Sequence, residues 1–328
     1  AAPVAEAPET TVPEAATPAA TATPVPTPAP EKAKLNVIAL KGPTGMGMVR
    51  LMQLGEQEQT AADYTVALAA APDEISGKLV TGEADIAAAP INLAAALYNK
   101  TGGKVKLIAV NTLGVLYILE NGDSVHSVAD LANVRLYATG QGATPEYVLN
   151  YLLEKNGVLG KVETSYMAEH AELAALLASG QGDVNVAMLP EPNATLSLLK
   201  NKELRVALDL TEEWNKVSGG VPLVQGCIVA RAEVLEERPE AVAAFLTEYA
   251  ASTAFTNEKP DEAAALIETY GILPSAAAAK AAIPNCNIVC VTGADMKASA
   301  KNMLQVLYDA DPKSVGGKLP GDDFYYVP

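Results

Sequence analysis

The chain has 328 residues, 49% of them apolar, and its 39 Asp and Glu against 23 Lys and Arg give a formal net charge of −16. This acidity excludes a nucleic-acid-binding surface, which needs clustered Lys and Arg. The sequence contains no apolar run of the length that crosses a bilayer. Its three cysteines and two histidines follow no zinc-binding spacing, so we expect no metal and no cofactor.

Residues 1–33 form a low-complexity segment rich in Ala, Pro, Thr, Glu and Val. Such a segment cannot bury enough apolar surface to offset its ordering entropy, so we predict a disordered, partly extended tether. The sequence begins inside this segment and without an initiator Met, and we therefore expect a secretion signal and a lipidated Cys upstream. The tether indicates an extracytoplasmic protein, lipid-anchored at the outer face of the cytoplasmic membrane or periplasmic.

Strand and helix patterns alternate over residues 34–115, the first part of a predicted lobe I. Short apolar runs predict strands, and amphipathic runs predict helices. The expected strands are 35–40, 64–68, 84–89 and 105–110, and the expected helices are 49–55, 72–80 and 92–98. This alternation predicts a mostly parallel sheet with helices on both faces.

A second alternation, over residues 116–224, predicts lobe II. A strand at 115–119 carries the chain out of lobe I, and residues 225–328 return to it through a strand at 225–230. The other expected strands are 135–138, 162–167, 184–189 and 204–208, and the expected helices are 146–154, 169–179, 190–200, 239–256, 260–270 and 295–309. The remainder after residue 230 is predicted to be helical. The fold class is therefore α/β and two-lobed, with two crossing segments that act as a hinge and a ligand cleft between the lobes.

The segment Gly42-Pro-Thr-Gly-Met-Gly47 lies between a predicted strand and a predicted helix. Its glycines allow positive φ and close backbone approach, so several N–H groups at the helix start can bind one ligand oxygen. The segment has neither the glycine spacing of a dinucleotide fingerprint nor the lysine of a P-loop. A tight turn without a ligand explains this motif, taken alone, equally well.

A similar segment, residues 138–147, opens the second lobe and places Pro145 at a favoured first-turn position. Two Gly/Thr-rich helix starts, one in each lobe, would hold a ligand in the cleft from both sides. We therefore predict that they converge on one cavity. The candidate ligand-binding residues on the two segments are Thr44, Gly45, Met46, Gly47, Thr139, Gly140, Gln141, Gly142 and Thr144.

Other strand ends are expected to line the same cleft, because ligands of α/β sheets bind beyond the carboxyl ends of the strands. Glu191 offers an acceptor for a ligand N–H or a cation, and exposure in a loop is the alternative. Met46 and Met48 offer an apolar wall, with ordinary core packing as the alternative. The remaining candidates are Asn92, Thr112, Leu113, Tyr117 and Asn193.

The sequence contains no recognisable catalytic motif, since both G-x-S-x-G and H-E-x-x-H are missing. His126 lies in a polar loop and His170 at a helix start, and both are predicted to be exposed. Trp214 is predicted to lie at the surface or at a rim. Cys286 and Cys290 allow either a short disulfide loop or two free thiols. The sequence therefore predicts a binding protein and not an enzyme.

The order of these motifs resembles the type II periplasmic-binding-protein fold, in the branch of solute-binding proteins for nitrate, sulfonates, taurine and thiamine precursors. The resemblance covers about residues 35–310 and rests on segments 42–48, 82–89, 139–145, 179–187, 189–192 and 228–244. It implies ligand contacts at Thr44–Gly47, Asn92, Thr112 and Gly140–Thr144, and docking on an ABC-type membrane permease. The sequence departs from the pyrimidine-precursor members by lacking a cysteine-rich cluster. It also has no obvious Arg near the cleft, which weakens the case for a sulfonate as the ligand.

The resemblance implies the extracytoplasmic solute-binding component of an ABC importer, a monomer that captures a small polar or anionic organic molecule. A carboxylate, a nitrate-like anion and a neutral heterocycle all remain open as ligands. The first alternative is a lyase or dehydratase on the same fold, with Glu191 as its acid or base. The second is a ligand-sensing module, against which the tether and the missing DNA-binding segment argue.

Overall fold

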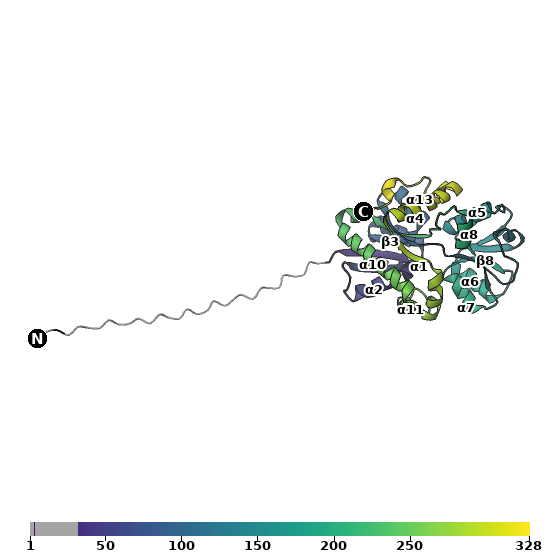
Figure 1. Cartoon of the computed structure of the whole chain (residues 1–328), viewed down its shortest axis with the longest axis horizontal. Helices are drawn as coiled ribbons and strands as arrows, with labels where there is room; N and C mark the ends of the chain where they lie inside the picture. The colour runs from purple at the N-terminus through teal and green to yellow at the C-terminus, as the bar shows by residue number, and fades with distance from the viewer. Residues whose placement is uncertain (1–2, 4–31) are drawn as a thin grey trace. The chain divides into compact units, whose positions relative to one another are not determined.

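Two β-sheets organise residues 32–328, which together with Pro3 are the residues that the computed structural model describes. The predicted tether, residues 1–33, lies almost wholly outside them. Residues 32–328 form one compact unit, and no helix within it is both long and apolar enough to span a membrane. The two sheets with their helices, here named lobe I and lobe II, lie side by side in Figure 1.

Lobe I contains a six-stranded sheet in the order β11-β4-β10-β3-β1-β2. Its strands are β1 (Lys34–Leu40), β2 (Asp63–Ala69), β3 (Ile86–Pro90), β4 (Val105–Thr112), β10 (Gly226–Arg231) and β11 (Ile288–Val291). Its helices are α1 (Pro43–Met46), α2 (Val49–Glu56), α3 (Pro72–Thr81), α4 (Ile91–Lys100), α9 (Ala232–Glu237), α10 (Pro239–Glu258), α11 (Pro260–Thr269), α12 (Ala276–Ala282), α13 (Gly293–Ala310) and the short 3-10 helices η2 (Ile283–Asn285), η3 (Pro312–Val315) and η4 (Asp322–Phe324).

Lobe II contains a five-stranded sheet in the order β7-β6-β8-β5-β9. Its strands are β5 (Leu116–Glu120), β6 (Arg135–Thr139), β7 (Glu163–Met167), β8 (Val186–Pro190) and β9 (Arg205–Asp209). Its helices are the 3-10 helix η1 (Val128–Asn133), α5 (Thr144–Lys155), α6 (His170–Ser179), α7 (Asn193–Lys200) and α8 (Leu210–Val217).

The strands of lobe I alternate their side chains between two apolar clusters. Ile38 of β1 packs in the cluster that includes α3, α4 and α13, whereas Val37 and Ala39 pack in the cluster that includes α2 and α10. Successive side chains of a strand point to opposite faces of the sheet. A strand that is apolar throughout therefore needs a helical layer on each side, as the continuous apolar runs in the sequence predict.

Strand direction shows where the chain crosses between the lobes. In lobe I, β1, β2, β3 and β4 point the same way and β10 is antiparallel to its neighbours β3 and β4. In lobe II, β6, β7, β8 and β9 point the same way and β5 is antiparallel to its neighbours β8 and β9. The chain enters β5 and β10 directly after it crosses between the lobes. Because these strands are antiparallel to their neighbours, each begins at the end of the sheet where the neighbouring strands finish. The crossing segments therefore lie at the carboxyl ends of the parallel strands.

The predicted α/β class, with two sheets and helices on their faces, is confirmed, but two details of the prediction are wrong. The chain after residue 230 is not wholly helical, because residues 288–291 form β11 and pair with β4. Trp214 is not at the surface. It is fully buried on α8, and its Nε1 donates a hydrogen bond of 2.7 Å to the Val221 carbonyl. The four-residue spacing of Leu210 and Trp214 places both on the buried face of this helix.

Candidate functional site

A pocket of about 190 Å³ lies between the lobes, at the carboxyl ends of β1, β3, β4 and β8. The loops that follow parallel strands gather at the end of the sheet where those strands finish, and α/β sheets usually bind their ligands there. The pocket is lined by Leu40, Lys41, Gly42, Pro43, Thr44, Pro90, Thr112, Val115, Gln225 and Gly226 on the lobe I side and by His170, Pro190, Glu191, Pro192 and Asn193 on the lobe II side.

Glu191 is the buried acidic group of this pocket. It follows β8 and precedes α7, and the side chain is 4% exposed. Its Oε1 accepts a hydrogen bond of 2.9 Å from the Thr195 hydroxyl, and its Oε2 accepts one of 3.3 Å from the Thr195 backbone N–H. Burial raises the pKa of Glu191 to about 7, although the bonds from Thr195 and the side chain of Asn285 oppose the shift. The loop exposure considered from the sequence is therefore wrong.

His170 lines the same pocket, which corrects its predicted surface position. It is the first residue of α6, and its Nδ1 lies 2.6 Å from the Thr139 hydroxyl at the end of β6. Burial lowers the pKa of His170, with Glu169 acting in the opposite direction. The ring is therefore neutral near pH 7, and its second nitrogen, Nε2, stays available for another partner. The rule that selected other strand ends would also have selected His170, because α6 follows the end of β7.

The Gly/Thr segment of lobe I contributes its first residues to the pocket and its later residues to the core. Thr44 lines the pocket, and its hydroxyl donates a 2.9 Å hydrogen bond to the Leu40 carbonyl. Met46 and Met48 are fully buried among apolar side chains, which decides for core packing over an apolar pocket wall. Gly45 and Gly47 lie in the same turn and do not line the pocket, since the turn directs them away from it.

The matching segment of lobe II does not meet Thr44 in one cavity. Gln141 and Gly142 line a different pocket, of about 460 Å³, which lies against α5 and the end of α13. The Gly142 N–H is taken by the Glu146 carboxylate at 2.6 Å, and Gly140 accepts a backbone hydrogen bond from Ala143. The predicted convergence of the two segments therefore fails for these residues, because local turn hydrogen bonds occupy them.

Other predicted residues connect the lobes instead of lining the pocket. The Thr144 hydroxyl of lobe II donates a 2.9 Å hydrogen bond to Asn92 Oδ1 of lobe I, and the Tyr117 hydroxyl donates to the Asn285 carbonyl at 3.2 Å. Leu113 donates its backbone N–H to the Asn287 carbonyl beside the crossing segment. Thr112 and Asn193 do line the pocket.

All three cysteines are free thiols, so the structure forms no disulfide between Cys286 and Cys290. Cys286 is fully buried in the apolar cluster that contains Met46, whereas Cys290 packs against the cluster of α2 and α10. The two side chains thus point to different parts of the core. Burial raises the pKa of both thiols.

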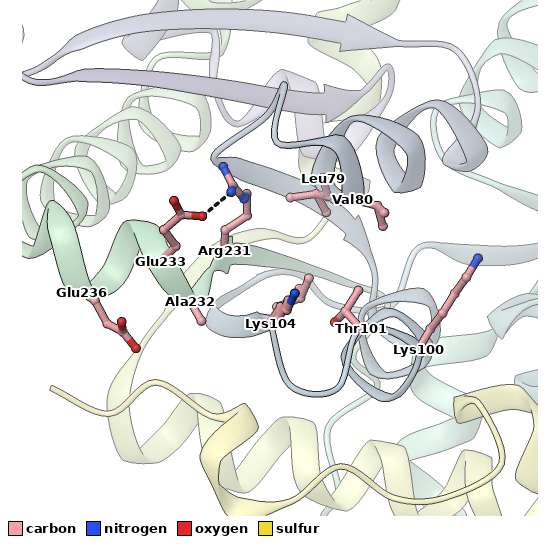
Figure 2. A pocket seen from close by; sticks show the side chains of 10 residues that line it. Leu79, Val80, Lys100, Thr101, Lys104, Arg231, Ala232, Glu233 and Glu236 are labelled. Carbon is pink, nitrogen blue, oxygen red and sulfur yellow. Dashed lines mark hydrogen bonds and ion pairs between the residues drawn. The ribbon is translucent and has the colours of Figure 1, made fainter.

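A larger pocket, of about 590 Å³, lies at the opposite end of the lobe I sheet. Figure 2 shows that its charged side chains do not converge: the Lys100 ammonium points away from Arg231, and Glu236 lies apart from both. Arg231 forms an ion pair with Glu233. These groups offer a ligand no common point of contact, so we place the functional site in the pocket between the lobes.

Two sheets joined by two crossing segments, with a pocket where the parallel strands end, are also the arrangement of solved ABC solute-binding proteins. An ABC transporter structure from Parabacteroides distasonis is 25% identical, covers 90% of this chain and 99% of its own, and superposes with a TM-score of 0.76. The periplasmic aliphatic sulphonate-binding protein SsuA from Escherichia coli is 18% identical over 92% and 93% of the two chains (TM-score 0.72). The nitrate-binding protein NrtA from Synechocystis PCC 6803 is 16% identical over 73% and 66% (TM-score 0.53). The predicted resemblance to this class is confirmed.

The chain belongs to the menaquinone biosynthesis family, whose model matches residues 50–281. No curated protein sequence matches the chain. The matched part includes both His170 and Glu191, whereas the lobe I loop at residues 40–44 lies before it. Most of the pocket therefore falls within the part of the chain that defines the family.

Proposed function

We propose that this chain is the extracytoplasmic solute-binding component of an ABC importer, and that it captures a small polar organic molecule in the pocket between lobes I and II. The observation that carries the proposal is the position of this pocket. It lies where the parallel strands of both sheets end, beside the two crossing segments. Its lining combines one buried carboxyl, one neutral imidazole and several amides and hydroxyls, which is the composition of a site for a small polar ligand.

Opening and closing would occur by rotation about the two crossing segments. A closely packed glycine lies at each: Gly114 within the first crossing segment, and Gly226 at the start of β10, where the second one ends. A Cβ on Gly114 would lie 2.1 Å from Thr211 Oγ1, and a Cβ on Gly226 would lie 2.6 Å from Asn111 Oδ1. The hydrogen bonds between the lobes, such as Thr144 to Asn92, belong to the closed arrangement. Closure would enclose the ligand and present a joined surface of both lobes to an ABC-type permease.

We also propose a location and an assembly state for the chain. A lipid anchor upstream of the tether would hold the chain, as a monomer, at the outer face of the cytoplasmic membrane. The domain boundaries would be 34–115 and 225–328 for lobe I and 116–224 for lobe II. Fractionation of a source cell, with the chain released from membranes by lipase or detergent, would test this location.

The test of binding is a thermal-shift screen with small polar metabolites, followed by small-angle scattering. A ligand that binds the native state alone raises the melting temperature by mass action, and closure on it should lower the radius of gyration. A hit that leaves the compound chemically unchanged after long incubation supports a binding protein. A screen without any hit, repeated on protein refolded to remove carried-over ligand, would contradict the proposal.

An enzyme is the second candidate, and two observations favour it: membership of the menaquinone biosynthesis family and the pKa of Glu191 near 7. A carboxyl with a pKa close to the working pH can act as acid or base. Turnover of a bound compound, followed by mass spectrometry and abolished in Glu191→Gln, would establish this candidate over the first.

A further inference from the structure

The charge around the pocket is unevenly placed. Lys41 is its one lysine among the described lining residues, and its side chain is exposed. None of the arginines in residues 32–328 lines it, and the imidazole of His170 is neutral because burial lowers its pKa. Glu191, in contrast, lines the pocket and is only 4% exposed. The site therefore contains a buried acidic group without a buried cation.

The hydrogen bonds of Glu191 favour its ionised form but leave it with free acceptor capacity. A carboxylate offers about four acceptor positions on its two oxygens. Thr195 occupies one position on each oxygen, and the side chain of Asn285 occupies one more, which leaves about one acceptor position free. A further N–H donor would stabilise the carboxylate, and a charged donor would also supply the missing counter-charge.

We infer that the ligand carries a basic nitrogen group, such as an ammonium, an amidinium or a protonated ring nitrogen, which donates N–H to the Glu191 carboxylate. This inference rests on the proposed function and names the ligand class of the same pocket. It departs from the anionic ligands of the sulphonate-binding protein SsuA and the nitrate-binding protein NrtA.

A second polar group of the pocket sets a further requirement on the ligand. The Nε2 atom of Gln225 is buried and has no hydrogen-bond partner among the described residues, and Gln225 lines the pocket where the second crossing segment enters β10. A buried donor without a partner costs free energy. The ligand would satisfy it with an acceptor, a carbonyl or a ring nitrogen, so that one molecule presents a donor to Glu191 and an acceptor to Gln225.

The same pocket would disfavour an anionic ligand. It would lie beside the buried carboxyl, and like charges at short distance in a low-dielectric site repel strongly. It would bind only with Glu191 protonated, so its affinity would fall as the pH rises above about 7. The affinity of a cationic ligand would rise over the same range. The pH dependence of binding therefore distinguishes the two classes of ligand, because affinity rises with pH for a cationic ligand and falls for an anionic one.

The experiment compares matched ring compounds by thermal shift and calorimetry. Benzylammonium, benzamidinium and aminopyridinium form the cationic panel, and benzoate and benzenesulfonate form the anionic panel. Each is titrated at about pH 5.5 and about pH 8, on either side of the Glu191 pKa. We expect the cationic panel to bind more tightly at the higher pH, by about tenfold, because removal of the Glu191 proton restores a charge-assisted hydrogen bond.

Glu191→Gln should lose at least about tenfold in affinity for the cationic panel, as is typical when one partner of a buried charged pair is removed. Glu258→Gln, an exposed change at the end of α10, is the matched control and should bind as the parent does. Should Glu191→Gln fail to fold, the parent alone still tests the inference: binding of the cationic panel near pH 6 must release a proton, seen as a binding enthalpy that depends on the buffer.

The outcomes separate this inference from the proposed function. Binding of the cationic panel that is lost in Glu191→Gln supports both. Binding of the anionic panel alone, or proton uptake instead of release, overturns the inference and leaves the proposed function standing. If neither panel nor any metabolite binds, the proposed function fails and the inference fails with it.

Discussion

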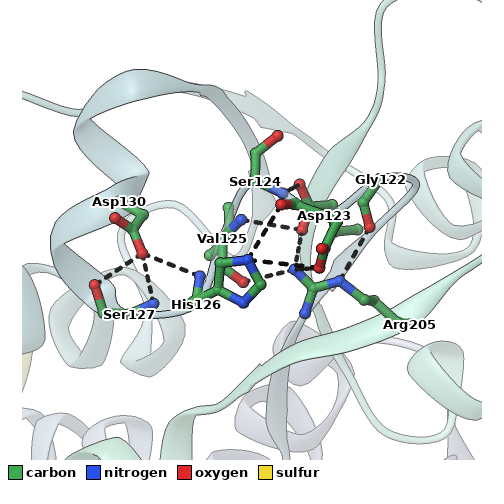
Figure 3. A network of polar contacts seen from close by, with 9 residues as sticks. Gly122, Asp123, Ser124, Val125, His126, Ser127, Asp130 and Arg205 are labelled. Carbon is green, nitrogen blue, oxygen red and sulfur yellow. Dashed lines mark hydrogen bonds and ion pairs between the residues drawn. The ribbon is translucent and has the colours of Figure 1, made fainter.

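Two glutamates of this protein are buried to a similar degree but have different surroundings. Glu120, at the end of β5, is 2% exposed, and Glu191 is 4% exposed. The carboxylate of Glu120 accepts hydrogen bonds from the backbone N–H groups of Ser124 and Val125, at 2.7 Å and 3.2 Å, and forms an ion pair of 2.5 Å with Arg205. Figure 3 shows the Arg205 guanidinium within this loop, where it also donates to the Gly122 carbonyl.

The comparison separates a structural carboxylate from a functional candidate. A buried charge is tolerated when a counter-charge and hydrogen bonds surround it. Glu120 has both, so it fixes the loop after β5, and His126 lies exposed on that loop as predicted. Glu191 has hydrogen bonds from Thr195 and the side chain of Asn285 but no ion pair among the described residues, and burial raises its pKa to about 7. The same side chain thus serves the fold in one place and remains available to a ligand in the other.

The largest expected effect concerns the counter-charge of Glu120. Arg205→Ala would leave a buried carboxylate with backbone partners alone, and we expect a loss of about 3 kcal/mol in the free energy of unfolding. Urea denaturation with tryptophan fluorescence would measure it. The double variant Arg205→Ala/Glu120→Gln should recover part of the loss, because it removes the unpaired charge.

Arg135→Ala is the control for this prediction. Arg135 also forms two ion pairs, with Glu163 and Asp183, but these lie on an exposed surface, where such pairs contribute little. We expect no measurable change in stability. An equal loss in both arginine variants would contradict the distinction between the buried and the exposed pair.

The next effect is the pH dependence that Glu191 gives to stability. Its pKa is raised from 4.5 to about 7 in the folded protein, so the folded state binds the extra proton between these values. The stability that this proton contributes is present below about pH 4.5 and is lost as the pH rises through 7. Glu191→Gln removes the dependence, and its stability relative to the parent should rise by up to about 3 kcal/mol between pH 5 and 8.

Other groups that face Glu191 must be considered in the same measurement. Its neighbours are Lys41 and His170 along the pocket, Tyr117 of lobe II and Cys286 of lobe I. His170 acts in the opposite direction, because its lowered pKa costs stability as the pH falls. Taking the difference between parent and Glu191→Gln at each pH cancels these contributions. A flat difference across the range would contradict the assignment.

The sequence predicted the order of strands and helices well, for a physical reason. Buried strands such as 34–40 and 105–112 are apolar runs followed by segments with Gly, Pro or Thr, so local pattern and tertiary position agree. The pattern failed at residues 288–291, where a four-residue strand forms through pairing with β4. A strand so short has no periodicity to detect, and pairing between distant segments decides it.

The site was predictable only in part. Glu191, Thr44, Thr112 and Asn193 were selected because they follow strands, and the structure gathers them in one pocket. Gln141 was selected by the same rule, but its turn faces a different pocket. Which way a loop turns after a strand depends on its local hydrogen bonds, and these are set by side chains several residues away, which the strand-end rule does not consider.

The smallest expected effect concerns a hydrogen bond between the lobes that involves Thr195, the residue that donates to Glu191. The Thr195 hydroxyl that donates to Glu191 also accepts a 3.4 Å hydrogen bond from Asn285 Nδ2 of lobe I. This contact joins the two lobes, and a single hydrogen bond of this kind is worth about 1 kcal/mol or less. Asn285→Ala should therefore change the free energy of unfolding little, but it should shift the ligand-free protein toward an open form. Small-angle scattering would show the radius of gyration of the ligand-free variant increased and that of the ligand-bound variant unchanged.

Asn257→Ala, which removes a bond to the Ile288 carbonyl within lobe I, is the control. It should leave both values as in the parent, because a lobe can loosen internally without moving relative to its neighbour.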